Sequence, residues 1–423
     1  MKNKVVLMFA YHFPPENAVG GTRPYRFYKY LCRMGYRCHV ITAADQSGRP
    51  DLDSETVSDP FVTGPRQGLG WQAERAVRRF LLPGVVGMRW SLLATCAARN
   101  FLRTIPDAQV TVFSTYPPLG THLAGFHLAR SEKLPWIADF RDPMGDNPSH
   151  PFLKHHQHQV YRWMERKVLK AADIVIANTD AVAEKWKRSY PSQSNKFQLI
   201  WNGFDPESRV PALPLPERNY QVVSHVGELY QGRSVTALLE SFGRLMASGQ
   251  LSPTQLRVRL VGSTLPESLP GADFLHRATA AGWLELVSKR VPHHEALAIA
   301  QTSNALLLIQ PHSTVQVPGK LFEYLQIGRP VLAYILRGTP IERILRNSGV
   351  PYHCVYADSA PAEMDRALKD FFELQAPSCP ANAWFEENFD ASKQTENLER
   401  LIRLTQQSRS RRERFAQREA AYD

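Results

Sequence analysis

The chain lacks several features that would assign it at once to a common protein class. Its five cysteines (Cys32, Cys38, Cys96, Cys354 and Cys379) are an odd number, widely spaced in 423 residues, and none forms a CxxC pair. This spacing argues against a disulfide framework or a zinc site and favours reduced thiols. Each cysteine is expected to be a small, buried apolar residue.

Long apolar runs are also missing. The N-terminal run at residues 5–10 is too short for the core of a signal peptide. No segment approaches the ~18 apolar residues of a membrane-spanning helix. The sequence therefore predicts a cytoplasmic protein, either free or attached peripherally to the inner face of the plasma membrane.

The composition is that of a globular protein with excess positive charge. Hydrophobic residues make up 43% of the chain and charged residues 22%, and 423 residues suffice for two or three domains. There are 51 lysines and arginines against 40 acidic residues, a net charge of +11. Such a balance favours an anionic partner, for which nucleotide, phospholipid and nucleic acid are all candidates.

Short apolar runs alternate with amphipathic stretches in both halves of the chain, which predicts βαβ units and parallel sheets. In the first half, strands are expected at 5–10, 38–42, 110–113, 136–139, 174–177 and 197–201, and helices at 22–34, 119–130, 153–170 and 181–188. In the second half, strands are expected at 221–226, 256–261, 284–287, 305–309 and 330–334, and helices at 234–246, 293–301 and 320–326.

A proline-rich break at 202–219 separates the two halves. The predicted fold is α/β, with two tandem Rossmann-like, doubly wound domains facing a cleft. The expected division is an N-terminal domain at 1–205, a linker at 206–219, a C-terminal domain at 220–384, a helix at 385–405 packing back on the first domain, and a basic tail at 406–423. Ligands of such sheets bind beyond the carboxyl ends of the strands.

Two polar groups follow strands in the first domain. Gly20 and Gly21 open a helix, where they permit close backbone approach to an anion, although the pattern is not GxGxxG and a simple turn is the alternative. In "ADFRDPMGDNP" (138–148), Asp139, Arg141, Asp142 and Asp146 crowd a strand end. These residues suit polar chemistry, or an Asp-Pro turn with a local ion pair.

His122 follows the preceding strand, in "TYPPLGTHLAG" (115–125). Its ring either faces the cleft or is a buried histidine within a helix, and the sequence leaves both open.

Two cations stand near helix starts in the second domain. Arg233 lies in "HVGELYQGR", and Lys320 begins the helix in "PGKLFEYLQIGRPVLAY". The helix dipole disfavours cations there, so an anion such as a diphosphate is expected between them. Glu323, one turn on, can accept two hydrogen bonds from the vicinal diol of a ribose. The alternative is a Lys-Glu surface pair at i,i+3.

A basic segment at 66–103 carries seven arginines against one acid, Glu74. In 89–103, Trp90, Leu93, Ala94, Ala97 and Phe101 share a helical face opposite three arginines. Such a helix either rests on an anionic membrane or packs on the sheet as an ordinary solvated helix. The C-terminal tail is expected to be a frayed, solvated end rather than a nucleic-acid binder.

In order and spacing, these motifs resemble the GT-B glycosyltransferases of the large retaining group called family 4. The resemblance runs over nearly the whole chain and looks closest to bacterial members that build exopolysaccharide or lipid-linked glycans. The stretches that carry it are "YHFPPENAVGGTRPYRF", "ADFRDP", "IANTDAVAEKW", "IWNGFDP", "HVGELYQGR", "LVGS" and "VPGKLFEYLQIGRPVLA".

The resemblance implies roles for individual residues. Glu323 matches the glutamate that holds the donor ribose, and Lys320 and Arg233 match basic residues near the donor diphosphate. The implied donor set is Gly20, Gly21, Gly227, Arg233, Lys320, Leu321 and Glu323; the acceptor side is His122, Arg141 and Asp142; and the catalytic set is Arg233, Lys320 and Asp142. No DxD motif or metal site is evident, so no cofactor and no metal are expected. The 66–103 segment matches the membrane-docking side.

The implied reaction moves a sugar from a nucleotide-diphosphate sugar, UDP being the first choice, to a glycan or polyprenyl-linked acceptor with retention. The departing phosphate is thought to help deprotonate the acceptor hydroxyl. Two residues depart from the family pattern: Val315 replaces a glutamate eight positions before Glu323, and Glu228 stands where relatives often have arginine. The alternatives are a sugar-nucleotide 2-epimerase of the same fold or an inactive glycan-assembly protein.

Overall fold

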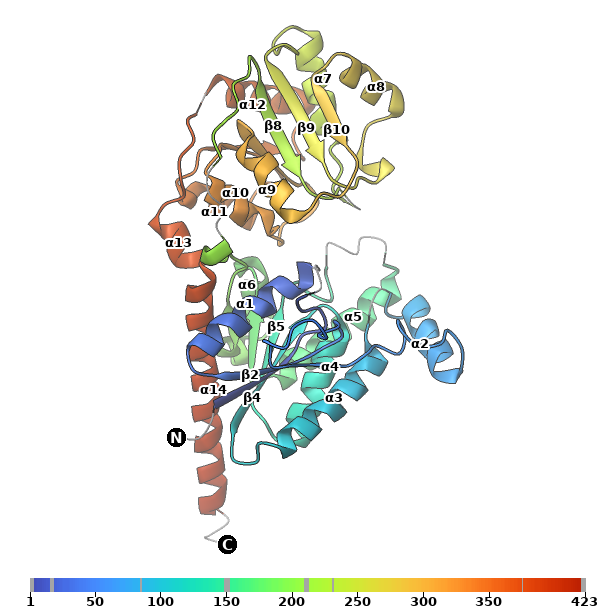
Figure 1. Ribbon diagram of the computed structural model, residues 1–423, viewed down its shortest axis with the longest axis vertical. Coiled ribbons are helices and arrows are strands. Elements are labelled where there is room, and N and C mark those ends of the chain that lie inside the picture. Colours follow the sequence, from blue (N-terminus) through green and yellow to red (C-terminus); the bar gives the residue numbers. More distant parts are fainter. Residues whose placement is uncertain are drawn as a thin grey trace. The chain divides into compact units, whose positions relative to one another are not determined.

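A computed structural model describes residues 4–15, 19–83, 86–147, 153–208, 213–229, 232–374 and 376–419, of which residues 19 and 408–419 are described by their backbone alone (Figure 1). The chain divides into two compact units. Unit 1 comprises Met1–Asn202 and Ala391–Asp423, and unit 2 comprises Gly203–Asp390. No helix in the described ranges is both long and apolar enough to cross a membrane.

Unit 1 is built on a parallel sheet of seven strands. They are β1 (Lys4–Phe9), β2 (Arg37–Thr42), β3 (Ser54–Thr56), β4 (Gln109–Tyr116), β5 (Trp136–Phe140), β6 (Ile174–Ala177) and β7 (Phe197–Leu199). Their spatial order is β3-β2-β1-β4-β5-β6-β7. The winding direction therefore reverses between β1 and β4, which is where doubly wound sheets bind ligands.

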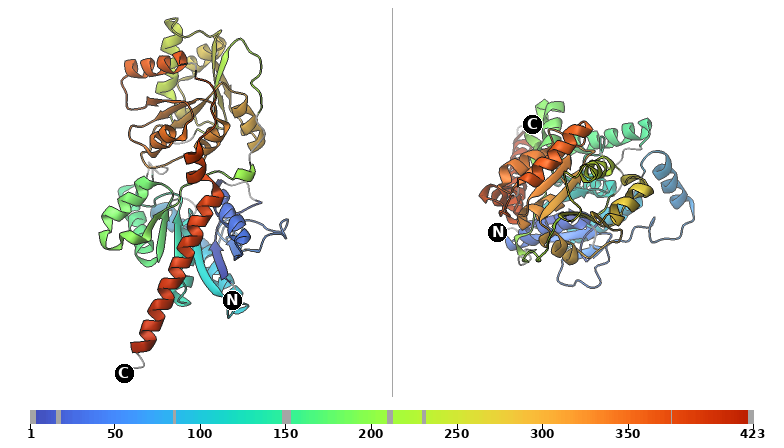
Figure 2. Two further views of the ribbon diagram at one scale, coloured as in Figure 1. Left: turned by 90° about the vertical axis from the view of Figure 1, so that its left-hand side faces the viewer. Right: turned by 90° about the horizontal axis from the view of Figure 1, so that it is seen from above.

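Helices cover both faces of this sheet (Figure 2). On one face α1 (Val19–Arg33) packs beside α14 (Ala391–Glu419), and both share an apolar core with alternate residues of β1, β2, β4 and β5. On the other face α3 (Met88–Arg103) and α4 (Leu119–Ser131) pack on the sheet and on each other. The remaining helices of unit 1 are α2 (Leu69–Phe80), α5 (His155–Ala171), α6 (Asp180–Ser189) and the short 3-10 turn η1 (Pro191–Lys196).

Unit 2 repeats the design with six parallel strands. They are β8 (Gln221–Val226), β9 (Leu256–Val261), β10 (Leu284–Val287), β11 (Ala305–Gln310), β12 (Val331–Ile335) and β13 (Tyr352–Tyr356), in the order β10-β9-β8-β11-β12-β13. The helices are α7 (Thr236–Ala247), α8 (Ala272–Ala280), α9 (His293–Gln301), α10 (Lys320–Ile327), α11 (Pro340–Ser348), α12 (Pro361–Glu373) and α13 (Ala383–Phe389), with 3-10 turns η2 (Pro206–Ser208) and η3 (Pro266–Ser268). The reversal of winding lies between β8 and β11.

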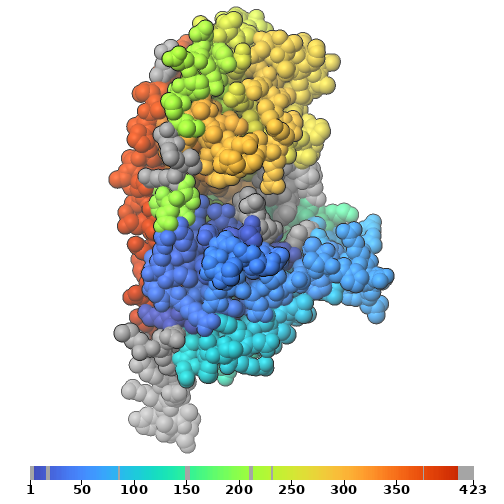
Figure 3. All heavy atoms as spheres, in the orientation of Figure 1, coloured from blue at the N-terminus to red at the C-terminus, as the bar shows by residue number. Residues whose placement is uncertain are grey.

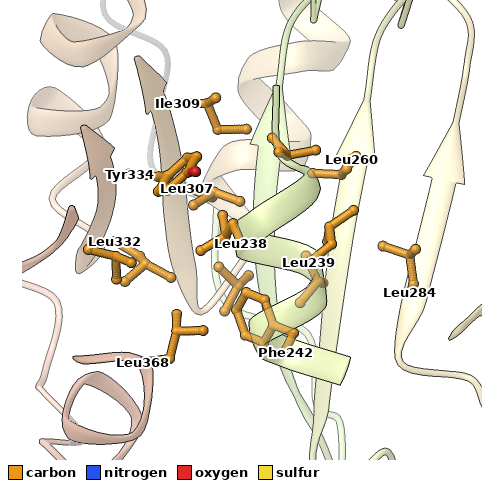
Figure 4. Close-up of a cluster of buried hydrophobic side chains, with 14 of the residues drawn as sticks. Leu238, Leu239, Phe242, Leu260, Leu284, Leu307, Ile309, Leu332, Tyr334 and Leu368 are labelled. Carbon is orange, nitrogen blue, oxygen red and sulfur yellow. The ribbon is translucent and has the colours of Figure 1, made fainter. Parts of the chain in front are cut away.

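The core of unit 2 explains why its central strands β11 (ALLLIQ) and β12 (VLAYI) are continuous apolar runs. Leu238, Leu239 and Phe242 of α7 lie over strand residues such as Leu260 and Leu307, all of them buried (Figure 4). A parallel sheet covered by helices on both faces buries successive side chains on both sides, so its central strands lose polar alternation.

The predicted fold class is confirmed: two parallel, doubly wound Rossmann-like units follow one another along the chain. The structure adds elements that the sequence did not predict, chiefly β3, α2, α8, α11, β13 and α12. At the C-terminus, α13 belongs to unit 2 and α14 to unit 1. The last helix was expected to end near residue 405 but continues to Glu419. Most of the segment predicted as a frayed tail (406–423) is therefore helical, while residues 420–423 lie outside the described residues.

Candidate active site

Lys320 is the first residue of α10, and its ammonium turns inward toward β8. Its Nζ lies 3.3 Å from Nε2 of His225, near the carboxyl end of that strand. Burial and the nearby guanidinium of Arg233 lower the pKa of Lys320 to about 7, against the opposing effect of Glu323 and Glu228. The predicted alternative, an ordinary Lys320–Glu323 surface pair, does not describe this side chain.

The tautomer of His225 follows from its two neighbours. The ring is fully buried, and its Nδ1 lies 2.9 Å from the carbonyl oxygen of Leu307. A carbonyl oxygen only accepts, so Nδ1 carries the proton and Nε2 is left to accept from the ammonium of Lys320. Burial, followed by the charge of Lys320, holds the pKa of His225 well below its usual range. The ring is therefore a neutral support for the lysine.

Gly227 makes room for the lysine head group. It follows β8 with φ near +146°, and its N–H donates to the carbonyl of Val261 at 2.7 Å. A Cβ at this position would lie 2.0 Å from Nζ of Lys320. The hydroxyl of Tyr324 accepts the N–H of Val226 at 3.2 Å, which fixes α10 against the end of β8.

A second cation, Arg233, lies near the same point, three residues before α7. Its charge lowers the pKa of Lys320 and contributes to lowering that of His312 to about 4, although burial is the larger cause in both cases. Gly232 packs under the same histidine, because a Cβ there would meet the ring at 2.9 Å. The structure thus brings Gly227, Arg233 and Lys320 together, as the sequence predicted.

Polar groups line the loop that follows β11. The amide oxygen of Gln310 and both ring nitrogens of His312 are buried and have no hydrogen-bond partner among the described residues. Ser313 organises the turn, because its hydroxyl accepts the N–H groups of Val315 and Gln316 at 3.3 and 3.0 Å. From the sequence, side chains of "IQPHSTVQVPGK" (309–320) were expected to select the sugar, but no local pattern distinguishes Gln310 and His312 as buried and unsatisfied.

Glu323 and Leu321 point to different places. The carboxylate of Glu323 is 35% exposed and lies 3.6 Å from Nε2 of His293 at the start of α9. Leu321 is fully buried, and its N–H donates to the carbonyl of Pro318 at 3.0 Å. The predicted ribose ligand is thus accessible, whereas the Leu321 side chain belongs to the core.

In unit 1, the side chain of Arg141 forms hydrogen bonds with backbone carbonyl groups. Its guanidinium donates to the carbonyl oxygens of Tyr116 at 3.2 Å, and of Pro117 and Gly20 at shorter distances. A Cβ on Gly20 would lie 2.7 Å from Nη1 of Arg141, and one on Gly21 would lie 3.2 Å from the backbone of Phe13. The glycine pair therefore lets the first turn of α1 pack closely against the segment after β1.

The structure places an unpredicted buried ion pair at the same edge of the sheet. Arg23 of α1 donates to both carboxylate oxygens of Asp139, at 2.8 to 3.2 Å, and the hydroxyl of Thr115 donates to one of them at 2.8 Å. The guanidinium also donates to the carbonyls of Ile200 and Trp201. Arg23 and Asp139 are 7% and 0% exposed, so this pair locks α1 to the ends of β5 and β7.

The other predicted residues of unit 1 lie apart. His122 is fully buried, with its Nδ1 2.8 Å from the hydroxyl of Ser114, and burial followed by Arg141 lowers its pKa to about 3. It is the buried histidine of the two alternatives, so an acceptor does not reach its ring in this fold. Asp146 forms an exposed ion pair with Arg162 at 2.8 Å and another with Lys185. Asp142 is partly exposed beside Arg141.

The basic segment at 66–103 forms two unlike helices. Trp90, Ala94, Ala97 and Phe101 of α3 are buried, whereas Leu93 of the same apolar face is 46% exposed. Most of this face therefore packs on the sheet, which was one of the two alternatives for this helix. The exposed member is α2, which projects from the body of unit 1 (blue, at the right in Figure 3).

The surface of α2 combines apolar and cationic groups. Leu69 and Phe80 are 87% and 60% exposed. Arg78 lies over the ring of Phe61 at 4.0 Å, and Arg75 lies over Trp71 at 5.2 Å. We call Leu69, Phe80 and the arginines 75, 78 and 79 the α2 face.

No cluster of three or more histidine, cysteine or acidic side chains suited to a metal ion occurs in the part of the chain that the structure describes. The five cysteines are free, but only Cys38 is buried, so the expectation that each of them is a buried apolar residue is wrong for the other four.

The sequence is similar to known proteins over part of its length. Residues 20–208 match the description of Glycosyltransferase Family 4. A curated relative, the alpha-maltose-1-phosphate synthase of Mycolicibacterium smegmatis, is 26% identical over 190 residues, which cover 40% of this chain and 46% of that protein. The chain thus matches about half the length of this relative.

Solved structures match over almost the whole chain. Anabaena Alr3699/HepE in complex with UDP and glucose has a TM-score of 0.59 at 14% identity, over 95% of this chain and 99% of that one. The UDP-forming α,α-trehalose-phosphate synthase of Burkholderia vietnamiensis has a TM-score of 0.61 at 14% identity, over 95% and 100%. The UDP-GlcNAc 2-epimerase of Methanocaldococcus jannaschii follows at 0.52 and 12% identity, over 96% and 100%. At such identities the likeness establishes the fold.

The whole chain thus has the two-domain fold of the GT-B proteins, and residues 20–208 match Glycosyltransferase Family 4.

Proposed function

We propose that this protein transfers a sugar, with retention, from a nucleotide-diphosphate sugar to a carbohydrate acceptor carried on a lipid, and that UDP is the nucleotide. The proposed donor site is supported by the group formed by Lys320, Arg233 and Gly227. Arg233 and Lys320 lie near each other beyond the carboxyl ends of β8 and β11, at the turn of Gly227, and burial together with Arg233 lowers the pKa of Lys320 to about 7. A diphosphate relieves the repulsion between them and restores the charge of Lys320.

The chemistry of this site is electrostatic. Lys320 and Arg233 stabilise the negative charge that grows on the leaving diphosphate, a contribution that increases toward the transition state. Glu323 accepts hydrogen bonds from the two ribose hydroxyls, and Gly227 lets the phosphates approach the main chain. Gln310 and His312 have buried polar atoms without hydrogen-bond partners among the described residues, and they bind the transferred sugar. They take the place of the family's first glutamate, where this chain has Val315. Asp142 remains the proposed catalytic group on the acceptor side.

The lipid-linked acceptor is supported by the α2 face. An arginine-rich helix with exposed leucine and phenylalanine suits the interface of an anionic membrane, where apolar groups enter the acyl boundary and arginines pair with phosphates. Trp163 of α5, 50% exposed, adds an aromatic group with Lys167 above its ring at 5.5 Å. This arrangement suits an acceptor presented at a membrane surface in exopolysaccharide or lipid-linked glycan synthesis.

The epimerase alternative differs in one respect that can be measured. An epimerase converts a nucleotide sugar without an acceptor, whereas a transferase releases sugar from the nucleotide only slowly without one. An inactive assembly protein binds the nucleotide and converts nothing. Incubation of UDP-GlcNAc and UDP-glucose with and without lipid-linked acceptors, followed by product separation, distinguishes the three.

The donor site itself is tested by calorimetric titration with UDP, GDP, ADP and dTDP. We expect one of them, UDP first, to bind the wild type and to bind Lys320→Met at least tenfold more weakly. At 100 times its dissociation constant it should stabilise the wild type by ~2.7 kcal/mol. The matched control is Lys369→Met, an exposed lysine of α12 paired with Glu373, which should bind as the wild type does. Equal affinity of all three proteins would contradict the proposed site.

A further inference from the structure

A cavity of about 480 Å³ lies at the carboxyl ends of β1 and β2 in unit 1. Its walls come from three segments: the residues after β1, the loop after β2, and the loop that follows β3. Tyr11, Asp45, Ser47, Asp59 and Thr63 supply its polar groups. The position is next to the reversal of winding between β1 and β4, where ligands of doubly wound sheets bind.

The floor of this cavity is held rigidly without a ligand. The hydroxyl of Tyr11 donates to Asp59 at 2.7 Å, and the N–H of Phe61 donates to the other carboxylate oxygen at 2.9 Å. The ring of Tyr11 packs edge-on against the buried Trp90 at 5.2 Å. Thr42 donates its hydroxyl to the carbonyl of Tyr11 at 3.0 Å. A site organised in advance loses less entropy when it binds.

The charge of the cavity is opposite to that of the whole chain. Two carboxylates, two hydroxyls and a phenol line it, and no lysine, arginine or histidine is among its lining residues. The N–H and hydroxyl of Ser47, which both donate to Asp45, lower the pKa of that carboxyl. A carboxylate has room for about four hydrogen bonds, and in Asp59 two positions are taken. The cavity therefore accepts hydrogen bonds from hydroxyl or amino groups and repels phosphate.

The rim of the cavity leads to the α2 face. Val62, 58% exposed, belongs to the lining, and its neighbour Phe61 stacks on Trp71 of α2 at 5.8 Å with Arg78 above the ring. An anionic pocket thus adjoins a cationic, apolar surface. A molecule with sugar hydroxyls at one end and a phosphate and acyl chain at the other matches both.

We propose that this cavity is the carbohydrate subsite of the acceptor, in which Asp45 and Asp59 bind the hydroxyl groups of an unphosphorylated sugar, while the phosphate and lipid of the acceptor stay outside on the α2 face. The inference rests on the proposed function and narrows it, because it excludes free sugar phosphates as acceptors. Asp45 is the specificity-determining residue at the mouth, and Asp59 is the fixed group on the floor.

The experiment uses the full chain with UDP present and saturation-transfer NMR. The probes are the methyl glycosides of glucose, galactose, mannose, N-acetylglucosamine and glucosamine, with glucose 6-phosphate as the charged counterpart. We expect at least one methyl glycoside to bind the wild type and to bind Asp45→Ala at least fivefold more weakly. Glucose 6-phosphate should not bind the wild type, and Asp45→Arg should admit it.

The matched control is Asp51→Ala, an exposed carboxylate paired with Arg49 outside the cavity, which should bind as the wild type does. If Asp45→Ala unfolds, Thr63→Val at the rim replaces it, with the same expected loss. The proposal is overturned if no glycoside binds, if binding survives in the cavity variants, or if glucose 6-phosphate binds the wild type as well as the glycosides do. UDP titration of the same samples separates this failure from failure of the donor site, because the cavity variants should bind UDP normally.

Discussion

The ammonium of Lys320 lies 3.3 Å from Nε2 of His225, a neutral ring buried at the end of β8. A neutral partner supplies a hydrogen bond without supplying charge. Burial and Arg233 lower the pKa of Lys320 to about 7, so at neutral pH the lysine is about half protonated. This relationship makes the charge of the site depend on whether an anion is bound.

We expect the affinity for UDP-glucose to fall as the pH rises above 7. The pKa of Lys320 is lowered in the free protein and returns toward its ordinary value beside a diphosphate, so binding takes up a proton in that window. Linkage then weakens binding by up to about tenfold per pH unit. Titration calorimetry at pH 7.5 and 8.5, in buffers of different ionisation enthalpy, measures both the affinity and the proton uptake.

Lys320→Arg is the control for this pH dependence. A guanidinium stays protonated throughout the range, so its affinity should not change between the two pH values, whatever its absolute strength. If the slope persists in Lys320→Arg, another group is responsible and the assigned pKa of Lys320 is wrong.

Substitution of Gly227 by alanine should remove nucleotide binding with a modest loss of stability. The added Cβ would occupy the place of Nζ of Lys320, 2.0 Å away, and would expel the ammonium from the site. We expect at least a hundredfold loss of UDP affinity by calorimetry. The control is Gly249→Ala, which has a positive φ of 72° and no atom within 4 Å of the new Cβ. Alanine at Gly249 carries a left-handed backbone strain of roughly 1–2 kcal/mol but should bind UDP normally.

The sequence was sufficient for the fold wherever local pattern and burial agree. β8, β9, β10 and α9 were predicted with the bounds that the structure gives them. α2 was missed because it contributes little to a core, and β13 (YHCVY) because its side chains are mostly half-buried. β13 therefore lacks the apolar run on which such predictions depend.

Some residues of the candidate site could also be predicted from local sequence pattern, and others could not. Gly227, Arg233 and Lys320 could be predicted together because each stands beside a strand end or helix start, and the parallel topology brings such points to one edge. His225 and Arg23 could not, because their roles depend on partners 95 and 116 residues away. Arg141 was assigned to the acceptor side by its neighbours, yet its donors are taken by backbone carbonyls.

Loss of Arg23 should destabilise unit 1 strongly. Arg23→Met leaves the carboxylate of Asp139 buried with one hydroxyl donor and the nearby charge of Arg141, and breaking a buried ion pair in this way costs about 3–5 kcal/mol. The double variant Arg23→Met/Asp139→Asn removes that charge and should be more stable than Arg23→Met alone. Urea denaturation followed by tryptophan fluorescence measures the order of the two.

An exposed ion pair provides the comparison for Arg23. Arg99 of α3 lies 3.0 Å from Glu132, with both side chains more than a third exposed. Arg99→Met should cost about 0–1 kcal/mol. If the double variant were no more stable than Arg23→Met, the cost would come from lost packing and lost carbonyl contacts rather than from the unpaired charge.

The two helices of the basic segment should differ in membrane binding, although both carry arginines. Replacing arginines 75, 78 and 79 by glutamine removes three charges from the exposed α2 face. At ~1 kcal/mol for each charge near an anionic surface, sedimentation with phosphatidylglycerol vesicles should show about a hundredfold weaker partition. Leu69→Ser/Phe80→Ser should weaken binding further at high salt, where the apolar contribution remains.

Arg99→Gln/Arg103→Gln is the comparison on α3, which removes two charges from a helix that has most of its apolar face in the core. It lowers the net charge but leaves the α2 face intact, so partition should fall less than tenfold. Losses in proportion to the number of charges removed, three on α2 against two on α3, would mean that the vesicles respond to net charge alone. In that case the α2 face would not be a docking surface, and the lipid-linked acceptor would lose the structural feature that now supports it.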